Sequence, residues 1–98
     1  MNDNVIHLLP EEQHKFAELL NHYQYLKPFW NWEKKECDID ALTKRIGTMS
    51  HAEAIIAKFF LSLWTHENHG FDIFEAVSTL DDEDLAMINH WMNAPFWP

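Results

Sequence analysis

Histidines and carboxylates gather between residues 66 and 72, where the sequence reads HENHGFD. His66, His69 and Asp72 follow one another at intervals of three, and on one continuous helix this spacing would place them near one face. Imidazole and carboxylate groups are ordinary ligands of zinc and other divalent metals. However, Gly70 interrupts the run, and glycine is typical of a helix end. The spacing also misses the H-E-x-x-H pattern by one residue, so these three residues are weak metal candidates.

Two further patterns contain residues that could bind a metal or act in catalysis, but both have ordinary explanations. Glu11-x-x-His14 matches half of a di-iron carboxylate motif, but such a centre needs a second E-x-x-H that the sequence lacks. Cys37 lies between Glu36 and Asp38, whose carboxylates raise the pKa of a thiol and disfavour a reactive thiolate. We therefore expect no catalytic residue, no bound metal and no cofactor.

Two stretches of the sequence resemble one another. Residues 19–23, LLNHY, are echoed by residues 87–91, MINHW, and a Pro-Phe-Trp segment follows each stretch, at 28–30 and at 95–97. Coincidence between two amphipathic helices explains so short an echo, because a repeat needs longer self-similarity or more copies. The alternative is a shared structural role, in which both Pro-Phe-Trp segments fold back over the ends of a central helix.

The aromatic residues in and beside these segments carry a large apolar area. Such rings either pack into the core of their own chain, form a self-association surface, or bind a foreign protein, since tryptophan and tyrosine often dominate binding energy. All three alternatives stay open at this point. The candidate partner-binding residues are Phe29, Trp30, Trp32, Phe96 and Trp97.

The formal net charge of −9 is unevenly distributed. Residues 1–49 carry a net −2, whereas residues 50–98 carry eight acids and one cation, Lys58, for a net −7. An acidic surface repels the phosphate backbone, so we expect no direct binding to nucleic acid, and it also favours solubility. The run Asp81-Asp82-Glu83-Asp84 lacks the alternating ligands and central glycine of a calcium loop and suits a helix start. The same run is a candidate acidic surface for a basic partner.

An apolar helix over residues 50–67 is predicted to position all of these groups. Ser50 followed by Glu53 is the pattern of a capping box at its start. Apolar residues then recur three and four apart and leave only a narrow polar seam, which indicates a central helix. The members of its main face are Ala52, Ile55, Ile56, Phe59, Phe60, Leu63 and Trp64.

Shorter helices are predicted around it. The first opens at Pro10 and continues until Pro28 ends it, and residues 28–36 form an aromatic connector with a single helical turn. Asp38 caps the second helix, which Gly47 ends in the left-handed conformation. Gly70 ends the central helix. The next helix spans residues 72–78, with Ile73, Phe74 and Val77 inward. The last begins after Asp81 and stops at Pro95, with Leu85, Ile88, Trp91 and Met92 facing the core.

The predicted fold is an all-α compact bundle of four to five short helices around the central helix, in one domain of residues 1–98. Residues 1–13 lack the basic segment and long apolar run of a signal peptide. No apolar stretch reaches the roughly 18 to 20 residues that span a bilayer, so no membrane association is expected. One cysteine, which cannot form an internal disulfide, fits a reducing compartment. A cytoplasmic protein is the expectation.

The predicted function is that of a small acidic non-catalytic helical protein that binds another protein. A homodimer is the first expectation, because dimers are the commonest assembly and would bury the aromatic residues; an adaptor for a foreign protein is the second. Two alternatives belong to other classes. One is an inhibitor that presents an acidic surface to a basic nucleic-acid-binding protein, and the other is a metal-binding protein that uses histidines and a carboxylate.

Overall fold

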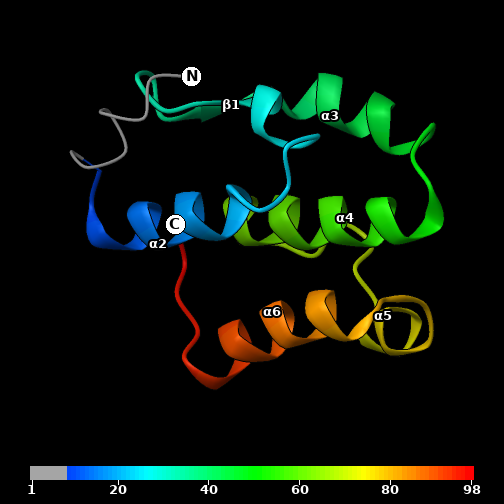
Figure 1. Ribbon diagram of the computed structural model, residues 1–98. Coiled ribbons are helices and arrows are strands. Elements are labelled where there is room, and N and C mark those ends of the chain that lie inside the picture. The colour runs from blue at the N-terminus through cyan, green and yellow to red at the C-terminus, as the bar shows by residue number, and fades with distance from the viewer. Residues whose placement is uncertain (1–8) are drawn as a thin grey trace.

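The computed structural model describes residues 9–98 and contains the predicted all-α bundle (Figure 1). Residues 1–8, which belong to the predicted domain and to the segment predicted to lack a signal peptide, lie outside the described residues. The α-helices are α2 (Glu11–Leu20), α3 (Ile39–Ile46), α4 (His51–Thr65), α5 (Ile73–Thr79) and α6 (Asp82–Asn93). Between α2 and α3 lie the 3₁₀ turn η1 (Lys27–Phe29) and the paired strands β1 (Trp30–Asn31) and β2 (Glu36–Cys37).

The helices form three layers with α4 in the middle one (Figure 1). Helix α3 and the β1–β2 hairpin lie on one side of the layer that contains α2 and α4, and α5 and α6 lie on the other. Surrounded in this way, α4 has few sides left for water, as its sequence predicted. Its buried residues are Ile55, Ile56, Ala57, Phe59, Phe60, Leu61 and Leu63.

Both ends of α4 have defined caps. The Oγ of Ser50 accepts from the backbone N–H of Glu53 at 3.2 Å, and the Glu53 carboxylate accepts from the Ser50 N–H at 3.1 Å. The predicted capping box is thus confirmed. At the other end His66, with φ of 60°, takes the left-handed conformation and ends the helix, four residues before Gly70, where the end was predicted. Gly70, with φ of 91°, comes later and shapes the loop to α5.

Two helix ends differ from the sequence prediction. Helix α2 ends at Leu20 rather than near Pro28, because the chain tightens into turns in which the Tyr23 N–H donates to the Leu20 carbonyl at 2.9 Å. This turn leaves Leu26 buried although it is no longer helical. Gly47 ends α3 with φ of −62°, so the predicted left-handed stop is wrong.

The hairpin was not predicted beyond an aromatic connector. Trp30 on β1 and Trp32 in the turn that follows both pack on Phe16 of α2, with ring centroids 5.5 and 6.0 Å from that of Phe16. Phe16 also packs edge to face on Phe60, and Trp30 and Trp32 both pack on Trp64. This aromatic cluster joins the hairpin, α2 and α4.

The inward faces of α5 and α6 are partly mispredicted. Helix α5 buries Ala76 completely and leaves Phe74, Val77 and Ile73 exposed, at 84%, 62% and 38% of their surface. The small alanine lets α5 lie close to its neighbours, which turns the larger residues outward. On α6 Ile88 is buried as predicted, but Met92 is 47% exposed because an open hollow lies beside it.

Candidate functional site

The five aromatic residues predicted to bind a partner do not share a surface. Trp30, Trp32 and Phe96 are buried within the chain, at 4%, 2% and 8% exposure, and Phe29 is partly buried against the same core. For these residues the burial agrees with the core alternative, and the hairpin turns both tryptophans inward. Trp97 is the exception, with 50% of its surface exposed.

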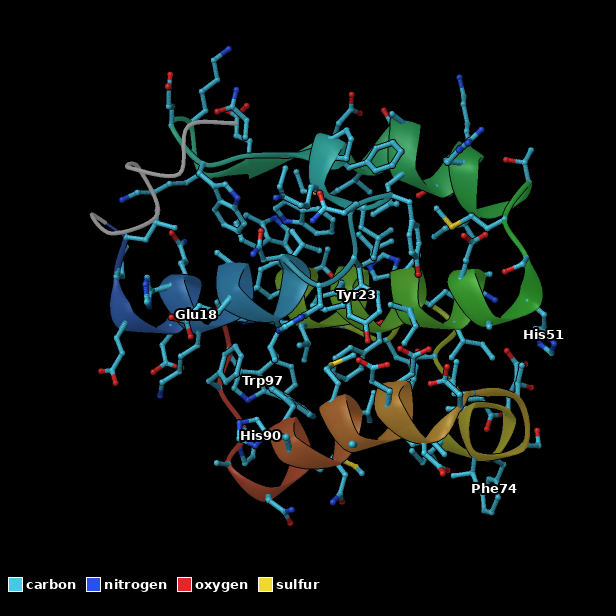
Figure 2. All side chains as sticks on the ribbon, in the orientation of Figure 1. Glu18, Tyr23, His51, Phe74, His90 and Trp97 are labelled. Atoms are coloured by element: carbon cyan, nitrogen blue, oxygen red, sulfur yellow. The ribbon has the colours of Figure 1, made fainter. Side chains whose placement is uncertain are left out.

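Trp97 lies at the C-terminal end of α4 (Figure 2). Its ring packs edge to face on Trp91 of α6 at 5.3 Å and on the imidazole of His66 at 5.6 Å. Trp30 packs on Trp64 in the last turn of the same helix, at 6.1 Å. The two Pro-Phe-Trp segments thus meet one end of α4, one ring inside the core and the other on its surface.

A hollow of about 240 Å³ opens beside Trp97. Side chains from α4, α6, the α4–α5 loop and the C-terminal segment form it, and most of them are apolar. We call this feature the aromatic hollow. It is lined by Phe59, Ser62, Leu63, His66, Glu67, Asn68, Phe71, Ile88, Trp91, Met92 and Trp97.

The three weak metal candidates have separate surroundings. The Asp72 carboxylate caps α5 and accepts from the N–H groups of Phe74 and Glu75 at 2.8 and 3.3 Å. His66 Nε2 lies 3.2 Å from the carbonyl oxygen of Pro98, whereas His69 Nε2 is buried without a hydrogen-bond partner. Within residues 9–98, no three histidine, cysteine or carboxylate groups are placed to hold a metal ion.

The acidic run of α6 divides between structural and exposed groups. Asp81 accepts from the Asp84 N–H at 2.9 Å and so caps α6, as predicted. Asp84 accepts from the Tyr23 hydroxyl at 2.8 Å, which ties the segment after α2 to the start of α6. Burial, this hydrogen bond and the Asp84 charge raise the pKa of Tyr23. Asp82 and Glu83 remain exposed and contribute charge to the surface.

Cys37 does not have the surroundings of a nucleophile. It lies on β2, paired with Trp30, and is half-buried. Burial, with a smaller contribution from the charge of Asp38, raises the pKa of its thiol to about 12. A thiol with such a pKa is almost entirely protonated at neutral pH, so it is a poor nucleophile and a poor metal ligand.

The two most exposed large apolar side chains of the described residues, Phe74 and Val77, lie on α5 together with the exposed Ile73. We call these three residues the α5 face. Residues three and four apart on a helix are neighbours, so these three side chains are contiguous. Figure 2 shows Phe74 pointing away from the bundle. Sequence periodicity missed this surface because α5 is apolar on both sides, and only its contacts reveal which side packs.

Acidic groups flank the α5 face in the sequence. Asp72 precedes it, Asp81 and Asp82 follow α5 closely, and all three are exposed. Glu75 lies within α5 itself, with its carboxylate 3.3 Å from His51 Nε2. The α5 face therefore combines an exposed aromatic group with acidic residues that precede and follow it in the sequence.

The two echoed stretches, residues 19–23 and 87–91, match in burial at every position. In each, the second residue is buried, the third and fourth are exposed, and the first and fifth are partly buried. The fifth residues pack on adjacent rings of α4, Tyr23 on Phe60 at 5.5 Å and Trp91 on Phe59 at 5.7 Å. The echo thus corresponds to two equivalent ways of packing a helix end on α4.

The histidines of the echo lie in one groove. His22 and His90 both line a groove of about 410 Å³, together with Tyr23, Glu83 and Asp84. Leu19, Ala86 and Met87 provide its apolar part. Both histidines are exposed, and the carboxylates of Glu83 and Asp84 are the acidic groups of the groove, which no lysine or arginine lines.

Comparisons of the chain with family models, curated proteins and solved structures find no match. None of the helices in residues 9–98 combines the length and the apolar character needed to cross a membrane.

Proposed function

We propose that this protein is a small non-catalytic binding protein that holds a partner protein on the α5 face. The observation that carries the proposal is the exposure of Phe74, at 84% of its surface, next to Val77 at 62%. Large apolar side chains that lie together on a surface mark interaction sites more often than scattered single ones. An aromatic residue at such a position often contributes much of the binding energy.

The charge around the α5 face favours a basic partner. Residues 50–98 carry a net −7, and the exposed Asp72, Asp81 and Asp82 flank the α5 face in the sequence. A second copy of the chain would bring like-charged groups against these, which costs energy, whereas lysine and arginine side chains would be attracted. We therefore propose an adaptor role ahead of a homodimer, with an apolar, lysine- or arginine-rich segment as the occupant.

The proposal also concerns the cellular location of the protein and two alternative functions. A cytoplasmic location is supported by the single unpaired Cys37, since extracellular domains of this size are often held by disulfides. The protein would act as an inhibitor if the basic partner held on the α5 face were a nucleic-acid-binding protein. A metal-binding role for His66 and His69 would leave Asp72 out, because its carboxylate already caps α5.

Two synthetic amphipathic peptides test the proposal, one of leucine and lysine and one of leucine and glutamate. We expect the protein to bind the lysine peptide, with an affinity that falls as salt is added, and to leave the glutamate peptide unbound. The double variant Phe74→Ser, Val77→Ser should weaken binding by about tenfold or more, as expected for loss of a binding hot spot. Calorimetric titration measures all of these affinities.

The matched control is Ile39→Ser, because Ile39 is 38% exposed, as Ile73 is, but lies on α3. Unchanged binding in this control, with loss in the α5 variant, supports the proposal. Equal binding in the α5 variant would overturn it. A dimer in native mass spectrometry that the α5 variant abolishes would instead assign the α5 face to a homodimer.

A further inference from the structure

Three of the side chains that line the aromatic hollow, Ser62, Asn68 and Trp91, have their polar atoms hydrogen-bonded within the chain. The Ser62 hydroxyl donates to the Lys58 carbonyl at 2.7 Å and accepts from the His69 N–H at 2.9 Å. The Trp91 indole N–H donates to the Phe96 carbonyl at 2.9 Å. The Asn68 amide is bound to the backbone of Gly70 and Phe71 through both of its ends. A polar group placed deep in the hollow would find few partners, which is costly.

The walls instead offer aromatic and aliphatic carbon. Phe59, Phe71, Trp91 and Trp97 come from four different parts of the chain and surround the same space. A dry apolar cavity of about 150 Å³ is enough to bind benzene. The hollow, at about 240 Å³ and open on one side, therefore accommodates an aromatic group of one ring, or two fused rings, while a substituent reaches solvent.

The rim of the hollow carries one carboxylate, that of Glu67. Glu67 lines the hollow and is exposed, and its carboxylate makes no hydrogen bond or ion pair with the described residues. Lys58, the one cation of residues 50–98, does not line the hollow. A positive group on a ligand would thus meet an unpaired carboxylate in a hollow whose other walls are mostly aromatic and aliphatic.

We propose that the aromatic hollow binds a small aromatic cation. The ring occupies the apolar space that Phe59, Phe71, Trp91 and Trp97 line, and a protonated amine lies at the rim beside Glu67. None of the residues of the α5 face lines this site, so the proposal does not rest on the proposed function.

Three ligands of one shape test the proposal: phenethylammonium, 2-phenylethanol and phenylacetate. Nuclear magnetic resonance follows the indole N–H signals of Trp91 and Trp97 during titration. We expect phenethylammonium to bind tightest and phenylacetate weakest. An exposed charge pair should make the cation bind roughly two- to fivefold better than the alcohol. Shifts confined to signals outside the hollow would overturn the proposal, as would equal binding of all three ligands.

Two variants separate the charge from the shape. Glu67→Gln should remove the preference for the cation over the alcohol while leaving alcohol binding unchanged, whereas the control Glu33→Gln, on the exposed hairpin loop, should keep that preference. Trp97→Ala should weaken all three ligands. Glu67→Gln leaves the apolar walls intact, so it tests the site even if loss of Trp97 disturbs the fold.

A second copy of the chain is the competing occupant, since the exposed Phe74 of one molecule is a ring of suitable size. In that case the Trp97 signal would change with protein concentration in the absence of ligand, and Phe74→Ser would abolish the change. This result would overturn the proposal of a small-molecule site.

Discussion

The two tyrosines show how packing changes the acidity of single side chains. Both tyrosines lie half-buried near the start of α6, with their rings edge to face at 6.2 Å. Burial and the charges of Glu53 and Asp84 raise the pKa of Tyr25 to about 12, and the pKa of Tyr23 is raised further by its hydrogen bond to Asp84. These shifts favour the protonated, neutral phenols in the folded state.

The shifts predict an alkaline limit to stability. A phenol in the unfolded chain has a pKa of about 10, below the pKa of either folded tyrosine. The free energy of unfolding therefore falls as the pH rises above the unfolded pKa and through the folded pKa values. Phenolate absorbance of the native protein should therefore lag behind that of the urea-unfolded protein. Tyr25→Phe should remove the earlier part of the native titration. A native titration that coincides with the unfolded one would contradict the prediction.

Cys37 provides a second prediction at this scale. Its raised pKa, about 12, leaves almost no thiolate at neutral pH. We expect iodoacetamide to modify the native thiol at least tenfold more slowly than the urea-unfolded thiol near pH 8, because the unfolded pKa is about 8.5. Mass spectrometry over time measures both rates. Comparable rates would indicate a thiol that is more accessible and more acidic than its surroundings imply.

Residue roles could be predicted from the sequence only where they depend on near neighbours. The caps formed by Ser50, Asp38 and Asp81 each join atoms three residues apart, so a short pattern contains all of the information. The burial of Trp30 and Trp32 depends on Phe16 and Trp64, which are distant in the sequence. The same aromatic composition would equally fit a core or an interface, and this is why the sequence left both open.

At the scale of elements, helices were predictable and the hairpin was not. Two-residue strands are too short to produce the alternation by which a strand is recognised. The hairpin turn also places Lys35 at φ of 55° where a glycine would have signalled a turn. Helix α5 was placed correctly but with the wrong side inward, since periodicity cannot rank a small buried alanine, Ala76, above a phenylalanine.

Helix α6 offers a test of local capping. Asp81 supplies the cap that accepts from the Asp84 N–H, so Asp81→Ala should lower the free energy of unfolding by about 1 kcal/mol. Asp82, the next residue, is exposed and contributes only through the helix dipole, so Asp82→Ala should cost about 0.3–0.5 kcal/mol. Urea unfolding measures both changes. Equal losses would mean that charge, rather than the hydrogen bond, stabilises the start of α6.

At the scale of the whole molecule, the layered arrangement explains how a short chain keeps an apolar surface. Helix α4 is enclosed by α2 and the two outer layers, which concentrates the core on one helix (Figure 1). Helix α5 contributes Ala76 to that core and can present its larger side chains to solvent. The α5 face and the aromatic hollow thus lie on elements that surround α4 rather than on α4 alone.

The uneven charge of the molecule makes a prediction about salt. With a net charge of −9, the folded chain is destabilised by repulsion among its own carboxylates, and salt screens this repulsion. The ion pairs found in residues 9–98 involve exposed side chains and contribute little, so their screening should not offset the gain. The melting temperature at neutral pH should therefore rise by a few degrees between about 10 mM and 300 mM sodium chloride, where the screening length falls steeply. Near pH 5.0, the isoelectric point, the net charge vanishes and the same salt series should have little effect.

If salt lowered the melting temperature at neutral pH, attractive pairs would outweigh the repulsion. The acidic residues that flank the α5 face would then be locally compensated, which would weaken the case for a basic partner.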